Sequence, residues 1–545
     1  MTPLKAHRFA RYLRFFGILD EYSDVIDGLM NGFSLHCSLT ISESLILPHH
    51  RSAIDHPEVI EKLITKELTA GRYVGPFDRA SLESIIGPFR SHPLGVIEKS
   101  KPGEFRVIED LSAPRDQPLL SVNATSIHDD IEVSWGTFVD ALRLVITAKP
   151  GAQGATFDWK DAYRAIPIAP DDYNKGIVEW LGQFLVDLAS KFGHTRSLTN
   201  FSRPCEAFIA IASRMSLGEF LKWVDDLFNR REPICDSPPY IYAYDMSDIC
   251  NLATELGIPF SLSKVTQFSD TTRYLGFDFH WSGKRVSIPS EKCAKAQAKV
   301  VTLLASGSAS IKELDSICGT LSHLSNVVLL GRSNLRGLWG QRASMATTGA
   351  NDFAKWPIRS AAKKNLEWWS SSLGNAPIFL DLCPQISPDP SITVYTDASS
   401  SWGIGVVINE VHDRFRLTDG WQRDGKPDSE PARDIGWAEF AAVELAVHAL
   451  VKSFGYAHRF FRILCDNQGV VGAWNSRSSR NVDQNEVLGR TMSLLLSHRC
   501  FMVLEYVPSS CNLADGPSRG LPLPSHPRTT FQGFPSNLRG LMFRA

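Results

Sequence analysis

Two acidic motifs, each at the end of an apolar run, constrain this chain more than any other feature. One lies within Thr156-Phe-Asp-Trp-Lys-Asp-Ala-Tyr163 and the other within Phe220-Leu-Lys-Trp-Val-Asp-Asp-Leu-Phe228. Burying a carboxylate costs several kcal/mol unless a cation compensates it, and two such motifs folded together would repel each other. Oxygen ligands suit Mg²⁺, and paired ions of this kind are typical of enzymes that transfer phosphoryl groups. The pattern predicts that Asp158 and Asp225, with Asp226 beside them, form a magnesium site.

Composition bounds the class of protein. The 545 residues, 43% of them apolar, are enough for several domains. Because 57 basic and 59 acidic residues nearly balance, nucleic-acid binding would need local basic surfaces, which argues against a pure coating protein. Ten cysteines without Cys-x-x-Cys spacing indicate a reduced, intracellular protein. The sequence shows neither a signal peptide nor a membrane span, so we expect a soluble protein without membrane association.

The periodic segments predict a multidomain protein of α+β and α/β type. We expect an irregular extension at residues 1–56 and then a mixed domain at 57–289. That domain would open with a helix from Pro57 to Leu68 and a hairpin of strands at 94–99 and 105–111.

The remaining chain divides again at a proline-rich segment. The alternating residues 271–281 predict one strand, and residues 290–382 are predicted to be helical. We expect a linker at 383–390, an α/β domain at 391–520, and a basic, flexible tail at 521–545.

The α/β domain carries four further acids at the ends of predicted strands or on predicted helices. They are Asp397, Glu439, Asp466 and Asp515, in the order strand end, helix, strand end and helix start. Such a cluster predicts a second site for two metal ions.

Several motifs resemble known families. Asp158-x-x-Asp161-Ala-Tyr163, Val224-Asp-Asp226 and Tyr274-Leu-Gly-Phe277 resemble the palm motifs of reverse transcriptases in order and spacing, and the four C-terminal acids resemble those of a ribonuclease H. More narrowly, the chain is similar to polymerases of DIRS-type retrotransposons in four segments: Arg72-Tyr-Val-Gly-Pro-Phe77, Pro93-Leu-Gly-Val96, Arg106-Val-Ile-Glu-Asp-Leu-Ser112 and Asp161-Ala-Tyr-Arg-Ala-Ile-Pro167. The resemblance implies a right-hand polymerase with fingers and palm at 57–289, a helical thumb or connection at 290–382, and a ribonuclease H-like domain at 391–520.

The resemblance also implies an activity and its cofactors. The chain would be an RNA-directed DNA polymerase of a retroelement that also cleaves RNA in RNA–DNA hybrids. Two Mg²⁺ ions, or Mn²⁺ instead, would be bound in each site. The polymerase ligands would be Asp158, Asp225 and Asp226, and the nuclease ligands Asp397, Glu439, Asp466 and Asp515.

Substrate contacts follow from the same resemblance. Lys99 and Arg106 would clamp the triphosphate of a deoxynucleoside triphosphate, Tyr163 would exclude a ribose 2′-OH, and Lys264 would assist the leaving pyrophosphate. The implied partners are an RNA template, a DNA primer and their hybrid. The sequence contains no zinc knuckle, Asp-Ser/Thr-Gly protease signature or His-His-Cys-Cys integrase pattern. An integrase or recombinase would therefore be a separate protein or a missing segment.

Three positions depart from the family pattern. Trp223 stands where a tyrosine usually precedes the paired aspartates, and the template-contacting motif is split between Phe192-Gly193 and residues 202–208. The loop Pro508-Ser-Ser-Cys511 lacks a histidine that family members often carry, which predicts slower turnover but no loss of fold.

Glu444 competes with Glu439 for the nuclease cluster. Five helical residues at about 100° each place the two side chains about 140° apart, so only one can face the cluster. Phe440, Val443 and Val447 mark the core side, and the family pattern of an acid before an apolar-Ala-Ala run favours Glu439. We expect Glu444 to lie in solvent.

Two other functions fit parts of the sequence. A decayed or domesticated retroelement copy would bind nucleic acid without catalysis. An RNA-dependent RNA polymerase shares the acidic palm motifs, but Tyr163 and the attached nuclease argue against it, because an enzyme that makes RNA duplex has no hybrid to degrade.

Overall fold

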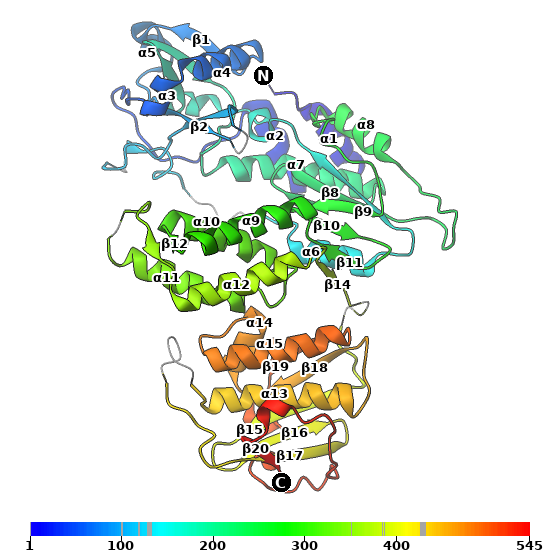
Figure 1. Ribbon diagram of the computed structural model, residues 1–545. Coiled ribbons are helices and arrows are strands. Elements are labelled where there is room, and N and C mark those ends of the chain that lie inside the picture. The colour runs from blue at the N-terminus through cyan, green and yellow to red at the C-terminus, as the bar shows by residue number, and fades with distance from the viewer. Residues whose placement is uncertain are drawn as a thin grey trace. The chain divides into compact units, whose positions relative to one another are not determined.

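The computed structural model describes residues 2–99, 102–117, 120–127, 133–349, 351–383, 385, 387–425 and 432–545. The chain is a mixed α and β protein that divides into two compact units (Figure 1). Unit 1 comprises Met1–Ala141 and Lys149–Thr272, and unit 2 comprises Leu142–Ala148 and Arg273–Ala545. Within the described residues, no helix is both long and apolar enough to cross a membrane.

Residues 6–31 are mostly helical and residues 51–55 form a further short helix, so the expectation of an irregular extension throughout residues 1–56 is wrong. The α-helices are α1 (Ala6–Phe15), α2 (Ser23–Asn31) and α3 (Arg51–Asp55). Phe9 and Leu13 of α1 are fully buried in one core with Phe208 of α7 (Ser197–Arg214) and Leu252 of α8 (Met246–Leu256). The sequence carries a signal for this helix that the expectation overlooked, because Phe9, Tyr12, Leu13 and Phe16 recur at helical spacing between arginines.

Unit 1 contains two three-stranded antiparallel sheets and a hairpin. The first sheet has the order β4-β8-β7, with β4 at Gln153–Asp158, β8 at Asp226–Arg231 and β7 at Glu219–Trp223. The second has the order β1-β6-β5, with β1 at Tyr73–Phe77, β6 at Gln183–Asp187 and β5 at Ile177–Trp180. The expected hairpin is present as β2 (Leu94–Glu98) and β3 (Phe105–Glu109), and the expected first helix as α4 (Pro57–Thr69). Helix α5 (Arg79–Ile86) follows β1, and α6 (Phe138–Thr147) spans the boundary between the units.

Unit 2 begins with a hairpin where a single strand was expected. Residues 271–281 form β9 (Thr271–Tyr274) and β10 (Phe277–His280), separated by Leu275 and Gly276 with φ angles of 48° and 72°. Positive φ at both central residues is the geometry of a two-residue type I′ turn. The expectation of one strand is therefore wrong, because regular alternation on both sides conceals the short turn. The sheet continues through β11 (Arg285–Ser287) and β14 (Phe379–Asp381) in the order β14-β11-β10-β9.

The predicted helical region follows. It contains α9 (Ser290–Ser306), α10 (Ile311–Leu324), α11 (Arg336–Ala346) and α12 (Ser360–Gly374), with β12 (Ser308–Ala309) and β13 (Trp356–Pro357) as a short pair. Helix α10 starts at a capping box in which Ser310 and Glu313 satisfy each other's backbone amides.

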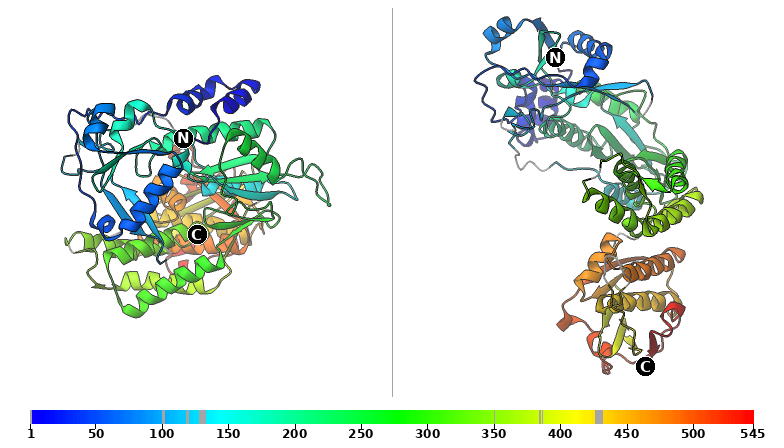
Figure 2. Two further views of the ribbon diagram at one scale, coloured as in Figure 1. Left: turned by 90° about the horizontal axis from the view of Figure 1, so that it is seen from above. Right: turned by 60° about the vertical axis from the view of Figure 1, so that its left-hand side comes forward.

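The C-terminal part of unit 2 is a six-stranded sheet of order β19-β18-β15-β16-β17-β20. Strands β15 (Thr393–Ala398), β16 (Gly403–Ile408) and β17 (Val411–Leu417) are antiparallel, whereas β18 (Phe460–Cys465) and β19 (Phe501–Tyr506) continue from β15 in parallel. Helix α13 (Ile435–Lys452) packs on β15 and β16 and also against α15 (Val482–Ser497), as Figure 1 and the right view of Figure 2 show. The remaining helices are α14 (Gln468–Ser476) and α16 (Asp515–Ser518).

Residues 521–545 are attached to this sheet through their last strand, so the expectation of a flexible tail there is wrong. Strand β20 (Met542–Arg544) pairs antiparallel with β17 at the sheet edge. The carboxylate of Asp413, which is fully buried, lies 3.0 Å from Arg544 Nε and accepts a hydrogen bond from the Phe531 backbone amide at 3.0 Å. A buried carboxylate needs such partners, and the tail supplies them from more than a hundred residues away.

Two neighbouring substitutions in β20 test whether the tail is part of the core. Met542 is 2% exposed and Phe543 is 50% exposed, because successive strand residues point to opposite faces. We expect Met542→Ala to lower the free energy of unfolding by roughly 2–5 kcal/mol and Phe543→Ala by about 0.5 kcal/mol or less. Denaturant-induced unfolding measures both values. Equal, small effects would mean that the tail does not pack on the sheet.

Candidate active sites

Asp158, Asp225 and Asp226, which come from the two acidic motifs, lie at one end of the sheet β4-β8-β7. Asp158 is the direct cross-strand partner of Asp226. Asp225 lies in the turn between β7 and β8, after Val224 with a φ of 54°, and its carbonyl oxygen accepts a hydrogen bond from the Trp159 amide at 2.9 Å. Two segments that are distant in sequence are thus joined at the position of their carboxylates.

The electrostatics of this site show a shortage of positive charge. Asp158 is 8% exposed, and Lys264 Nζ donates to its Oδ1 atom at 2.6 Å. Burial and then the charge of Asp158 raise the pKa of Asp225, while burial and the charges of Asp225 and Asp158 raise the pKa of Asp226. Lys264 and the charge of Arg106 do not neutralise three carboxylates, so the donor set fits a divalent cation with oxygen ligands.

Two expected substrate contacts lie within electrostatic reach of Asp225. Tyr163 is on η3 (Ala162–Ala165), a one-turn 3₁₀ helix, and its ring lies 4.8 Å from that of Phe192. Burial, and then the charge of Asp225, raise the pKa of Tyr163. The charge of Arg106, on β3, also acts on Asp225. Lys99 instead lies 3.8 Å from Glu104 of its own hairpin, so the structure does not link it to the aspartates.

An aromatic pair that sequence reasoning missed lies beside these aspartates. Trp223, 42% exposed, is the cross-strand neighbour of Asp226. Its ring lies 5.8 Å from the ring of Trp135, whose segment is attached to β7 by a hydrogen bond from the Gly136 amide to the Lys222 carbonyl at 2.7 Å. No local pattern around Trp135 indicates this contact.

The four C-terminal acids also form one cluster. Strands β15 and β18 are parallel neighbours, and Thr396 is in register with Cys465. Asp397 and Asp466 are the residues that come directly after this pair, so they lie at the same end of the two strands. Burial raises the pKa of Asp397 to about 7, together with the charge and hydrogen bond of Asp466 and the charge of Asp515, although a hydrogen bond with Ser518 opposes this shift. Burial, followed by the charges of Asp397 and Asp466, raises the pKa of Glu439 to about 9. Like charges held this close fit a site for divalent cations.

Cys465 is a second residue that sequence reasoning missed. Its Sγ atom lies 4.0 Å from Glu439 Oε2. In the described ranges, one set of three residues has potential ligand atoms within 4.8 Å of one another: Glu439, Cys465 and Asp466. The carboxylate oxygens of the three aspartates in unit 1 are therefore farther apart than this. Burial raises the pKa of the Cys465 thiol, which therefore stays neutral, and a thiol is a poor ligand for Mg²⁺. The carboxylates remain the suitable donors.

Glu444 is buried, so the expectation that it lies in solvent is wrong. Its side chain is fully inaccessible and accepts hydrogen bonds from Arg490 Nε at 2.8 Å and Nη2 at 3.0 Å. The angular argument correctly separates the directions of Glu439 and Glu444, but α15 covers the second face of α13. Both glutamates are therefore buried, with different partners.

No family model matches the chain, and no curated protein matches it. Solved structures with a similar chain path include the foamy viral protease-reverse transcriptase dRH in complex with double-stranded DNA, at 15% identity over 89% of this chain and 79% of that chain, with a TM-score of 0.47. The foamy viral protease-reverse transcriptase in complex with double-stranded DNA matches at 17% identity over 91% and 93%, with a TM-score of 0.46. Its complex with an RNA/DNA hybrid matches at 14% identity over 93% and 83%, with a TM-score of 0.39. Similarity at this level does not extend to individual residues, so a functional assignment depends on the two carboxylate clusters.

Proposed function

We propose that this chain is an RNA-directed DNA polymerase of a retroelement, with a second site that cleaves RNA in RNA–DNA hybrids. The observation that carries the proposal is the gathering of seven carboxylates, from separate segments, into one cluster in each unit. Clusters of like charge, here partly buried, are unfavourable without cations, and paired divalent ions are the usual means of phosphoryl transfer in polymerases and nucleases.

In the polymerase site, Asp158 and Asp225 would hold Mg²⁺, with Asp226 beside them. The bound ions would stabilise charge on the attacking 3′-oxygen and on the departing pyrophosphate. Lys264, 2.6 Å from Asp158, would place its ammonium group near that leaving group. Arg106 would bind the triphosphate with its planar fork of donors, and Lys99 would add a second positive charge from the same hairpin.

Tyr163 would determine which sugar is accepted. Its ring contacts the rings of Phe192 and Phe201, with ring centroids 4.8 and 5.8 Å away. An aromatic ring fixed by two such contacts would fill the space beneath the sugar of the incoming nucleotide. A ribose 2′-OH would then meet the ring, so deoxynucleotides would be preferred.

In the nuclease site, Asp397, Glu439, Asp466 and Asp515 would hold the metal ions. The bound ions would activate a water molecule for attack on an RNA phosphate. Ser518 hydrogen-bonds to Asp397 and would orient its carboxylate, and Arg519 holds Asp515 at 2.8 Å. Selection of the RNA strand would depend on its 2′-OH groups and on the hybrid's shape. The narrower assignment to DIRS-type retrotransposons rests on the sequence motifs alone.

Primer extension tests the proposal. With an RNA template, a DNA primer, deoxynucleoside triphosphates and Mg²⁺, we expect the primer to be extended and the RNA of the hybrid to be cut. Chelation should stop both reactions, and Mg²⁺ or Mn²⁺ should restore them. A protein that binds the template-primer but performs neither reaction would contradict the proposal and support a decayed copy.

A further inference from the structure

The turn that carries Tyr163 cannot hold its own position. It is a single 3₁₀ turn, and Asp161 before it adopts the left-handed conformation with φ 53° and ψ 30°. A helix of this length has few internal hydrogen bonds, and a non-glycine residue in the left-handed region persists only where surrounding structure imposes it. Contacts from elsewhere in unit 1 must therefore fix the Tyr163 ring.

Phe192 and Phe201 contact the ring itself, and Arg164, the next residue, anchors the turn that carries it. Its guanidinium, 9% exposed, donates to both oxygens of Asp187 at 2.8 and 2.9 Å. It also donates from Nη2 and Nε to Glu67 Oε2 at 2.8 and 3.2 Å, and from Nη1 to the carbonyl oxygens of Ala189 and Ser190 at 3.1 and 3.2 Å. Glu67 and Asp187 are 2% and 1% exposed, so the arginine joins two buried carboxylates.

Glu67 also connects Arg164 to Asp161, the residue at the start of the same turn. Glu67 accepts hydrogen bonds from Arg72 Nε at 2.6 Å and Nη2 at 2.9 Å, and Arg72 Nη2 lies 3.8 Å from Asp161 Oδ2. Burial opposes ionisation of Glu67, but its hydrogen bonds from Arg72 and Arg164 outweigh burial and lower its pKa to about 2. Glu67 is thus linked directly to Arg164, the residue after Tyr163, and through Arg72 to Asp161, the residue before the turn.

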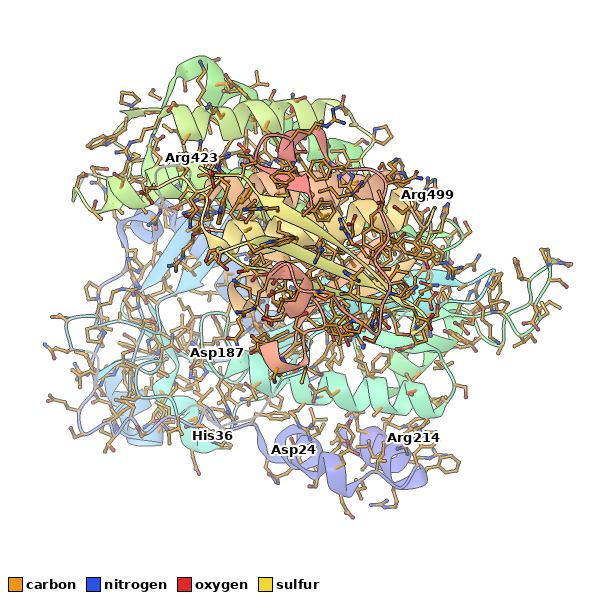
Figure 3. All side chains as sticks on the ribbon, turned by 90° about the horizontal axis from the view of Figure 1, so that it is seen from below. Asp24, His36, Asp187, Arg214, Arg423 and Arg499 are labelled. Carbon is orange, nitrogen blue, oxygen red and sulfur yellow. The ribbon has the colours of Figure 1, made fainter. Side chains whose placement is uncertain are left out.

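In the other direction the contacts reach the hairpin that bears Arg106. Asp187, labelled in Figure 3, lies 3.4 Å from Lys191 Nζ, and Lys191 Nζ donates to Glu109 Oε2 at 2.5 Å. Glu109 is the last residue of β3, three residues after Arg106. The inner members of this series of charge pairs, Glu67, Arg164, Asp187 and Lys191, are all buried.

We propose that Arg164 is a positioning residue for nucleotide selection, which sets the Tyr163 ring against the sugar and in register with the Arg106 hairpin. This inference rests on the proposed polymerase function. Buried ion pairs add little stability over apolar side chains of similar volume, but they impose one geometry when every donor is satisfied. A site that discriminates between two sugars by the position of one ring requires such a geometry.

Arg164→Lys is the direct test, because lysine keeps the charge but cannot bridge Asp187 and Glu67 with a planar fork. The measurement is single-nucleotide incorporation, with kcat/KM for a deoxynucleotide divided by kcat/KM for the matching ribonucleotide. We expect this ratio to fall roughly tenfold or more, with a raised KM for the deoxynucleotide and unchanged hybrid cleavage. Arg230→Lys is a matched control, because Arg230 also lies between two carboxylates, Glu219 at 2.8 Å and Glu232 at 3.6 Å, and should leave the ratio unchanged.

A double variant separates positioning from a general loss of structure. If Arg164 acts through Tyr163, adding Arg164→Lys to Tyr163→Ala should change the ratio less than about twofold, since interacting residues are not additive. Should Arg164→Lys unfold, Glu67→Gln gives the same test with the side-chain shape retained.

Each outcome bears on one claim. An unchanged ratio in folded Arg164→Lys, or a full effect in the Tyr163→Ala background, overturns the inference alone. A native chain that extends no primer overturns the proposed function, and the inference with it.

Discussion

Asp225→Asn is expected to reduce DNA synthesis roughly 10³-fold or more while leaving hybrid cleavage unchanged. Asparagine retains the size of the side chain but removes a charged ligand from a site whose three carboxylates already repel each other. Metal ions at the reacting oxygens lower the barrier by several kcal/mol, and about 1.4 kcal/mol is a factor of ten in rate. Primer extension and cleavage of a labelled hybrid, measured on one preparation, give both activities.

The control for this prediction is Asp245→Asn in the same unit. Asp245 caps α8, and its side chain accepts a hydrogen bond from the Ser247 amide. Asparagine is nearly as good a cap as aspartate, so DNA synthesis should stay near the native rate. If Asp225→Asn is folded and loses both activities, the two sites are not separable.

The reverse separation is expected at the second cluster. Glu439→Gln should reduce hybrid cleavage roughly 10³-fold and spare DNA synthesis, and Asp466→Asn should do the same. The Glu439 pKa of about 9 means that this carboxyl is protonated at neutral pH before a metal binds, and metal binding must displace that proton. Glutamine cannot become a carboxylate, so the anionic ligand is lost.

Glu444→Gln is the matched control on the same helix. Glu444 is buried, and its carboxylate is paired with Arg490, which is not part of the cluster. The substitution should lower the free energy of unfolding by roughly 1–3 kcal/mol without changing cleavage per folded molecule. A loss of cleavage as large as that of Glu439→Gln would contradict the assignment of Glu439.

Features that depend on neighbouring residues in the sequence could be predicted. An acid directly after an apolar alternating run identifies Asp158 and Asp397 at strand ends, and the paired Asp225 and Asp226 identify a turn between strands. The helices after Ser290 and the hairpin of β2 and β3 follow from periodicity and turn residues in the same way.

Features that depend on distant partners could not be predicted. Strand β20 is an example, because Arg544 meets the buried Asp413, which lies more than a hundred residues earlier in the chain. The sequence around Arg164 does not indicate that its side chain is buried, because its partners Glu67 and Asp187 come from other segments. In each case the stabilising contact joins residues that no local pattern connects.

Anomalous diffraction from crystals grown with Mn²⁺ tests the central claim most directly, because it locates the cations without requiring activity. The account predicts manganese bound by Asp158 and Asp225 in unit 1, and by Asp397 and Asp466 in unit 2. Manganese absent from both clusters at saturating concentration, or Asp158 and Asp225 turned away from each other, would contradict it.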